Sequence, residues 1–222
     1  MKARQDGLDS ACTICRDFQE PNAVILRHAS TSLNERGEWQ GRDTNAPLSA
    51  SGRHDAAEVG LEICRIYPEV EWTILTSPLL RAQQTALAFS KAGVKCQELL
   101  VCDELIEADV GRMTGRTWGE FARMAPSEFA AWKRGLTPSF REGENRDQLL
   151  ERARDALAKA RGFDRVIVVT HLMLMTAVRE MLPLSRDTPI SNLGGFMGWY
   201  ASSDRPRETW CAVGDDHCDP RG

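Results

Sequence analysis

Short apolar runs alternate with longer amphipathic stretches along most of the chain. Four of the runs are rich in branched residues and show no alternation of polar and apolar positions, which is typical of buried strands. These runs are residues 23–26, 72–76, 98–102 and 165–170. Apolar positions recur with helical spacing in residues 50–66, 78–91, 147–161 and 172–181. Strands that alternate with helices predict an α/β fold, here a three-layer α/β/α sandwich around a mainly parallel sheet.

Candidate capping residues mark the starts of two of these helices. Ser49 or Ser51 is a suitable N-cap for the first helix, and Ser77 is one for the second. Pro78 directly follows Ser77 and suits a first helical turn. Late in the chain, residues 194–201 and 208–213 predict a hairpin or a pair of edge strands.

The segment 112–146 differs from the rest of the chain. It is rich in aromatic residues and is interrupted by Pro126 and Pro138, so we expect a small helical insertion over one end of the sheet. Its aromatic side chains either line the entrance of a pocket or form the core of the insertion, and helical spacing favours the core. They are Trp118, Phe121, Phe129, Trp132 and Phe140.

Length and charge narrow the function classes. With 222 residues, 42% of them hydrophobic, the chain fits a single domain over 1–222, with a core at about 23–213 and tails at 1–20 and 214–222. A net charge of -4 argues against nucleic acid or a membrane surface as the partner, because either needs a basic excess on one face. The polar start and the lack of a long apolar run predict a cytoplasmic protein.

The seven cysteines do not form a dense disulfide framework, which is typical of reduced thiols in a cytoplasmic protein. Two groups near the termini raise a second possibility. Cys12 and Cys15 form a C-x-x-C pair, and Cys211, His217 and Cys218 lie near the other end. If the termini met, these groups would suit tetrahedral zinc. Their wide separation in sequence favours free thiols instead.

Polar side chains follow the predicted strands at the point where ligands bind in open α/β sheets, beyond the carboxyl ends. Arg27 and His28 close the first strand, and Arg81 lies early in the helix after the second. Glu107 follows the third strand, and His171 follows the fourth. Any one of them has an ordinary explanation as a solvated or capping residue. Their recurrence at corresponding places in successive strand-helix units indicates one shared site.

With these positions, the chain resembles the histidine phosphatase superfamily, in its phosphoglycerate mutase-like branch, and most of all the small broad-specificity phosphatases. The segments that carry the resemblance span about residues 23 to 180. They are "LRHASTSLN", "QGRDTNAPLSASGRHDA", "LTSPLLRAQQTA", "LIEADVGRMTG", "EGEN" and "VIVVTH". One departure is Ala29, where the family usually has glycine; alanine does not take a positive φ freely, but no reactive group is lost.

The resemblance implies a phosphatase that needs no metal or other cofactor and forms a phosphohistidine. His28 would be the nucleophile, with Glu107 as proton donor to the leaving oxygen and later as base toward water. Arg27, Arg81 and His171 would hold the phosphoryl oxygens. The resemblance also places Thr31, Asn34 and Leu172 at the substrate. Independently of the family, an imidazole between two guanidinium groups has its protonated form disfavoured and stays nucleophilic.

Two alternatives to hydrolysis remain at this stage. Mutases of this branch carry an arginine and a tyrosine just after the catalytic glutamate, whereas Ala108, Asp109 and Val110 follow Glu107, so hydrolysis is favoured. The other alternative is a non-catalytic module that binds a phosphorylated ligand on the same fold. We expect the partner to be a small phosphorylated metabolite such as a sugar phosphate or a nucleotide. Acidic residues, namely Asp109, Glu142 and Glu144, are expected to give the rim of the site a negative bias.

Overall fold

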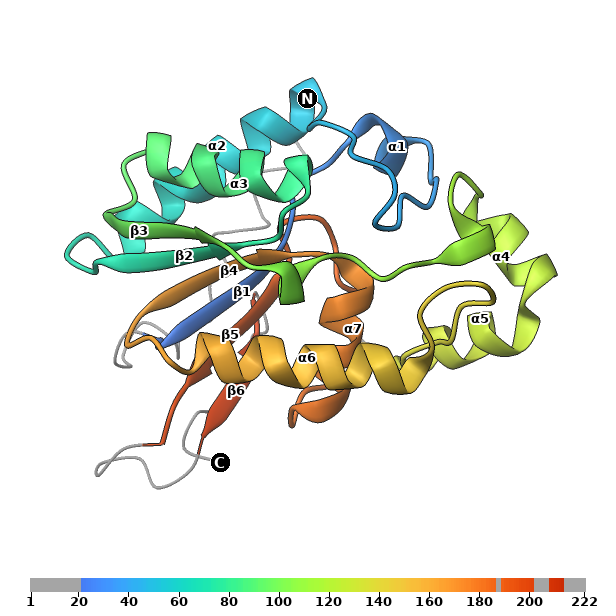
Figure 1. Cartoon of the computed structure of the whole chain (residues 1–222). Coiled ribbons are helices and arrows are strands. Elements are labelled where there is room, and N and C mark those ends of the chain that lie inside the picture. The colour runs from blue at the N-terminus through green and yellow to red at the C-terminus, as the bar shows by residue number, and fades with distance from the viewer. Residues whose placement is uncertain (1–20, 187–188, 202–207, 214–222) are drawn as a thin grey trace.

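The computed structural model describes residues 21–186, 189–201 and 208–213. At its centre is a six-stranded sheet in the order β3-β2-β4-β1-β5-β6 (Figure 1). The first four of these strands run parallel, β5 pairs antiparallel with β1, and β6 pairs antiparallel with β5. The predicted mainly parallel sheet and the late pair of strands are therefore confirmed. The strands are β1 (Ala23–Arg27), β2 (Trp72–Thr76), β3 (Cys96–Val101), β4 (Val166–Thr170), β5 (Gly195–Trp199) and β6 (Thr209–Ala212).

Helices cover both faces of the sheet, with α2 and α3 on one face and α6 and α7 on the other (Figure 1). Alternate side chains of β1 enter different cores: Val24 and Leu26 pack in the core of α2 and α3, and Ile25 in the core of α6 and α7. This is the predicted three-layer sandwich. No helix within the described ranges is long and apolar enough to cross a membrane. The helices are α1 (Ser32–Glu35), α2 (Ala50–Ile66), α3 (Leu80–Lys91), α4 (Trp118–Met124), α5 (Pro126–Lys133), α6 (Arg146–Ala160) and α7 (Leu172–Met181).

The capping predictions have different outcomes for the two helices. Ser49 is the N-cap of α2, where its side chain accepts a hydrogen bond of 3.0 Å from the Gly52 N–H. Ser77 does not cap α3, which begins at Leu80 and has Leu79 as its N-cap residue without a side-chain bond. That prediction was wrong because the helix begins three residues after Ser77, whose hydroxyl oxygen accepts from the Leu79 N–H over 3.2 Å and also lies 2.7 Å from Nε2 of His171.

The third predicted strand, β3, differs from expectation in its surroundings. It exists at the predicted place, but it forms the edge of the sheet and pairs only with β2. Most of its side chains are exposed, and Val101 keeps 53% of its surface accessible. The prediction of a buried strand was therefore wrong, because a run of apolar residues does not show whether a strand has one neighbour or two.

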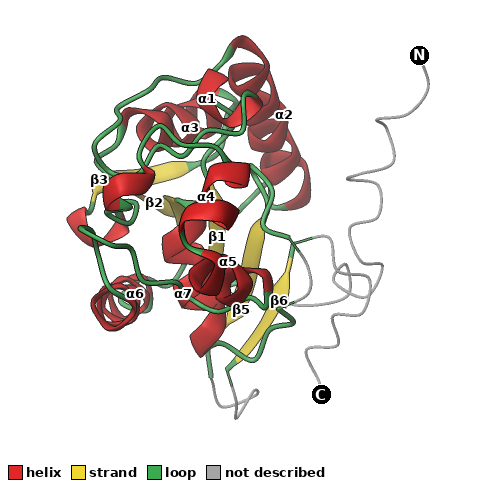
Figure 2. Cartoon of the chain, turned by 90° about the vertical axis from the view of Figure 1, so that its right-hand side faces the viewer, coloured by secondary structure: helices red, strands yellow, loops and turns green. Residues whose placement is uncertain are grey.

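The insertion at 112–146 is helical, as predicted. A 3₁₀ turn at Gly111–Met113 leads into α4 and α5, which lie in front of the central strands when the sheet is viewed from the end shown in Figure 2. Phe121 and Phe140 are buried, and Trp39 packs edge-on against both from outside the insertion. Phe121 and Phe140 thus form the core of the insertion, as helical spacing favoured, whereas Trp118, Phe129 and Trp132 pack against it and are only partly buried.

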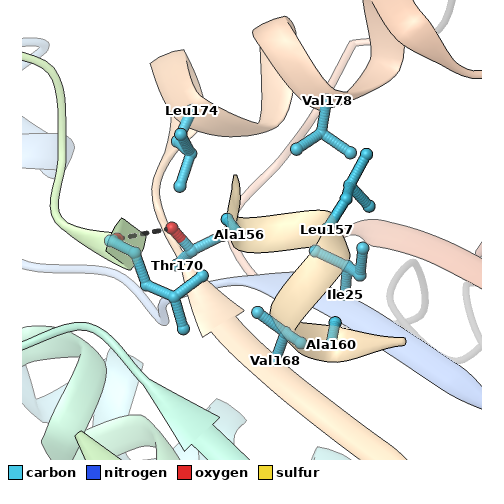
Figure 3. Close-up of a pocket in the computed structure, with 9 residues that line it drawn as sticks. Ile25, Ala156, Leu157, Ala160, Val168, Thr170, Leu174 and Val178 are labelled. Atoms are coloured by element: carbon cyan, nitrogen blue, oxygen red, sulfur yellow. Dashed lines mark hydrogen bonds between the residues drawn. The ribbon is translucent and has the colours of Figure 1, made fainter. Parts of the chain in front are cut away.

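Packing between the sheet and the helices α6 and α7 is tight. A cavity of about 10 Å³ lies there, lined mainly by apolar side chains that include Ile25, Val168 and Leu174 (Figure 3). A single water needs roughly 10–15 Å³, so this is a packing defect with no room for a ligand. At its edge the Thr170 hydroxyl donates a 2.7 Å hydrogen bond to the Leu105 carbonyl. This bond ties the end of β4 to the segment that carries Glu107.

Candidate active site

Two histidines emerge side by side from neighbouring strands. Arg27 at the end of β1 pairs in register with Thr170 at the end of β4, so the next residues, His28 and His171, lie together beyond the carboxyl end of the sheet. Their ring centroids are 5.1 Å apart, and both side chains are almost fully buried. Parallel pairing thus brings together two residues that are 143 positions apart.

The surroundings of His28 fix its tautomer. Its Nδ1 lies 2.7 Å from the Ala29 carbonyl oxygen, which can only accept, so Nδ1 carries a proton. In the neutral ring, Nε2 then holds the lone pair, and the Arg81 Nε–H donates to it over 3.3 Å. Burial, followed by the charges of Arg81 and Arg27, holds the pKa of His28 well below its usual value. The ring is therefore neutral at physiological pH, with a nucleophilic nitrogen directed at the arginine.

The two arginines are held by backbone carbonyls. The Arg81 guanidinium donates to Gly41 over 2.9 Å and to Thr44 over 2.7 Å, and Arg27 donates to Ile190 over 3.1 Å. Burial lowers the pKa of each arginine to about 10, so both remain cationic at neutral pH. The buried Nε of Arg27 has no partner among the described residues. An anionic ligand would supply the missing acceptor.

His171 is the N-cap residue of α7, and its ring is oriented by Ser77. The Ser77 oxygen accepts from the Leu79 N–H over 3.2 Å and also lies 2.7 Å from Nε2 of His171. Nδ1 of His171 is buried without a partner in the described part of the chain. Burial, and after it the charge of Arg81, lowers the pKa of His171 well below its usual value.

Glu107 lies across the same cavity, 8% exposed. Its Oε1 accepts hydrogen bonds from the Ala108 N–H over 2.8 Å and from the Met173 N–H, in the first turn of α7, over 3.2 Å. The carboxyl group also interacts electrostatically with both arginines. It is therefore fixed near the arginines without forming an ion pair with either of them.

The three residues expected at the substrate occupy different positions. Asn34 and Leu172 line the cavity, whereas Thr31 is fully buried behind it as the N-cap residue of α1. The Thr31 N–H donates to Asn34 Oδ1 over 3.1 Å, which leaves the Asn34 amide nitrogen as the end available to a ligand. Thr31 thus orients Asn34 and does not line the cavity.

The cavity has a volume of about 170 Å³ and includes residues that sequence analysis missed. Asn192 donates to the His28 carbonyl over 2.8 Å and lies 3.5 Å from Asn34 Oδ1. It lies in a segment without periodicity, 164 residues after His28, so no local pattern marks it. Trp118, one of the aromatic residues considered for a pocket entrance, also lines the cavity, and the other missed lining residues are Gly37, Glu38, Trp39, Gln40, Gly41 and Met173.

The expected acidic rim is absent from the described cavity lining. Glu144 is buried and paired with Arg42 and Arg152, and Glu142 is paired with Arg112 outside the cavity. The third acid, Asp109, accepts from the Gly111 N–H over 2.9 Å. The predicted negative bias from these three residues is therefore wrong, because arginines and backbone donors take up their carboxylates.

The zinc alternative falls mostly on residues outside those described, namely Cys12, Cys15, His217 and Cys218. The remaining member, Cys211, is buried in β6. Within the described ranges, no group of three histidine, cysteine or acidic side chains is arranged to hold a metal ion.

A sequence model of the histidine phosphatase superfamily, branch 1, matches residues 23–192. The chain belongs to this superfamily. The match covers all of the site described above, from β1 to Asn192, and confirms the resemblance noted in the sequence.

Two curated relatives and one solved structure show how far the similarity extends. The metal-independent phosphoserine phosphatase of Arabidopsis thaliana is 32% identical over 162 residues, which cover 70% of this chain and 66% of that protein. A bifunctional protein of Mycobacterium tuberculosis is 29% identical over 161 residues, 72% of this chain and 41% of its own length. The chain therefore spans two thirds or less of the length of these curated relatives. A mycobacterial glucosyl-3-phosphoglycerate phosphatase in complex with VO3 superposes with a TM-score of 0.68 at 22% identity, covering 87% of this chain and 97% of that one, which shows a shared fold.

Proposed function

We propose that this protein is a metal-independent phosphatase that hydrolyses a small phosphomonoester through a phosphohistidine at His28. The observation that carries the proposal is the His28 ring, which is neutral and buried beside two arginines with the lone pair on its Nε2. A phosphoryl group placed there would meet the nucleophile, two cations and the unpartnered nitrogens of Arg27 and His171 together. A purely structural cluster would gain nothing from leaving those buried nitrogens without partners.

In the first half of the reaction, His28 Nε2 attacks phosphorus and the bond from phosphorus to the leaving oxygen breaks. Glu107, in its protonated form, gives its proton to that oxygen, so the leaving group departs as a neutral alcohol. Arg27, Arg81 and His171 stabilise the charge that spreads over the phosphoryl oxygens. The two guanidinium groups supply the positive charge that a metal ion provides in other phosphatases.

In the second half, water attacks the phosphorus of phosphohistidine. Glu107, now a carboxylate, takes a proton from that water while the bond between phosphorus and Nε2 breaks. His28 returns to its neutral form, because the proton has stayed on its Nδ1, hydrogen-bonded to the Ala29 carbonyl oxygen, throughout. Inorganic phosphate then leaves, and the site is restored.

The substrate is a small phosphorylated metabolite, for which a sugar phosphate or a nucleotide remains our expectation. The names of the similar proteins, phosphoserine phosphatase and glucosyl-3-phosphoglycerate phosphatase, support phosphate esters of this size. Mutase activity is the less favoured alternative. The residues after Glu107 include the buried, uncharged Ala108 and Val110, so they add no cation for a substrate carboxylate.

Labelling of the nucleophile tests the proposal. Wild-type protein incubated with a ³²P-labelled phosphomonoester and quenched rapidly should carry acid-labile phosphate, and His28→Ala should carry none. His54→Ala is the matched control, because His54 is exposed on α2. Labelling that persists in His28→Ala would disprove the nucleophile, and phosphate binding without labelling or turnover in the wild type would favour the non-catalytic module.

A further inference from the structure

A buried carboxylate outside the cavity connects three segments that form the active site. Glu144, at the end of the insertion, accepts from Arg152 through both carboxylate oxygens, at 2.9 and 2.7 Å. It also accepts from Arg42 over 2.8 Å. Burial alone would raise the pKa of Glu144, but the hydrogen bonds and charges of the arginines hold it below its usual value. A charge buried in this way is stabilised only while its partners keep their geometry.

Arg152 extends this network to the backbone that carries Glu107. From α6 its Nη1 donates to the carbonyls of Glu104, over 3.0 Å, and Ile106, the residue directly before Glu107. On the other side of Glu107, the Asp109 carbonyl accepts from the Glu144 N–H over 2.8 Å. The chain is therefore held on both sides of the proposed proton donor by the same pair of residues.

Arg42 connects the network to the phosphoryl side of the site. It lies between Gly41 and Thr44, whose carbonyls hold the Arg81 guanidinium. One carboxylate thus links the loop that fixes Arg81 to the segment that fixes Glu107. The distance between the proposed acid and the phosphoryl group is set across this link.

The end of the insertion packs closely, backbone against backbone, on the segment that follows Glu107. A Cβ added to Gly143 would lie 2.3 Å from the Asp109 carbonyl oxygen. Gly111, at φ +50°, approaches Arg141 so closely that a Cβ there would lie 2.4 Å from its carbonyl oxygen. Only glycine permits both approaches, so the end of the insertion and the segment after Glu107 are in direct backbone contact.

We propose that Arg152 and Glu144 are positioning residues for Glu107, which hold its carboxyl group at the distance needed to protonate the leaving oxygen. The inference rests on the proposed function and adds residues that touch neither substrate nor phosphate. Misplacing a catalytic group by about 1 Å costs on the order of 10²-fold in rate. The loss should depend on how much the leaving group needs a proton.

The leaving group separates this role from a merely structural one. An alkyl phosphate leaves poorly without a proton, whereas p-nitrophenyl phosphate leaves readily as the anion. In single-turnover phosphorylation of His28, Glu107→Gln should lower the rate constant about 10²- to 10⁴-fold with the alkyl ester and far less with the aryl ester. We expect Arg152→Met to show the same selectivity with a loss of about 10²-fold on the alkyl ester. The ratio of the two rate constants does not depend on the fraction of protein that is folded.

The double variant gives the sharpest test. If Arg152 acts through Glu107, then Glu107→Gln combined with Arg152→Met should lose no more on the alkyl ester than Glu107→Gln alone. Lys159→Met is the matched control: Lys159 lies on the same helix and forms its described ion pair with the Glu104 carboxylate of the same segment, not with the backbone around Glu107. It should keep the wild-type rate on both esters.

Two further variants guard against misfolding. Arg152→Lys keeps the charge but not the paired guanidinium donors, and its rate on the alkyl ester should fall between those of the wild type and Arg152→Met. Glu144→Gln with Arg152→Met removes both charges of this pair, so neither is left buried alone, and the charge that remains, on Arg42, belongs to a side chain that is 33% exposed. Equal losses on both esters in these variants, or additive losses in the double variant with Glu107→Gln, would overturn the positioning role. If the wild type is labelled and Glu107→Gln is selective, such a result leaves the proposed function intact; an unlabelled wild type would overturn both.

Discussion

Acidification should destabilise the fold through the two buried histidines. The pKa of each is held well below its usual value, first by burial and then by neighbouring positive charges. In the unfolded chain each histidine titrates near pH 6.5. Below that pH the histidines bind protons in the unfolded state but not in the folded state. Their contribution to the free energy of unfolding is therefore fully present above about pH 6.5 and declines as the pH falls.

The size of the effect follows from proton linkage. Between about pH 6.5 and about pH 5.5, each histidine that stays neutral in the fold should lower the free energy of unfolding by about 1 kcal/mol, and the pair by about 2 kcal/mol. Urea unfolding of the ligand-free protein at those two pH values measures this directly. The change in free energy, not its absolute value, is the quantity to compare.

Three variants separate the two histidines from other titrating groups. His28→Asn retains a donor for the Ala29 carbonyl, and His171→Gln retains an acceptor for Ser77. Each should reduce the acid-induced loss by about 1 kcal/mol. His54→Gln changes an exposed histidine, so the acid-induced decrease in the free energy of unfolding that comes from His28 and His171 should remain. If neither His28→Asn nor His171→Gln alters the pH dependence, the two rings are protonated in the folded protein and the neutral nucleophile is wrong.

Three other predictions test the charge, the support and the shape of the site. Hydrolysis should survive chelators, because two buried arginines meet the phosphoryl charge; loss in EDTA that magnesium or manganese restores would contradict this. Thr85→Val should cost about 1–3 kcal/mol in urea unfolding, because it leaves the buried Ala29 N–H, now 3.0 Å from the Thr85 hydroxyl, without an acceptor, whereas Thr85→Ser should cost less. Gly52→Ala should slow phosphorylation, since its Cβ would lie 2.0 Å from the Ser30 carbonyl oxygen next to the nucleophile loop; Gly119→Ala, with open space around it, is the control, and equal rates would exclude this steric effect.

Much of the site could be predicted because parallel strands end at the same edge of a sheet. Arg27 and His28 follow one apolar run, and His171 follows another, so their meeting required only that both runs be parallel strands. Glu107 could be placed by the same reasoning. The residues proposed to react with substrate therefore belong to local patterns that can be recognised in the sequence.

The supporting residues could not be predicted, because their roles depend on contacts between distant segments. Glu144 is expected from the sequence at the rim of the site, and only its contacts with Arg42, 102 residues earlier, and with Arg152 make it a buried link. Asn192 reaches the His28 carbonyl from 164 residues away. The exposure of β3 has the same origin, since strand order in the sheet is not encoded in the periodicity of any one strand.

The order of the strands has a consequence for how the protein is made on the ribosome. Both neighbours of β1 in the sheet, β4 and β5, are synthesised more than 130 residues after it, and β4 separates β1 from β2. A nascent chain that ends before residue 166 therefore offers β1 no partner within the sheet, and closing such non-local pairs is slow. Until β4 is synthesised, the apolar β1 stays exposed, and we expect chaperones to protect this segment during synthesis. His28 would acquire its buried surroundings only when β4 is inserted, so no shorter nascent fragment should turn over phosphate esters.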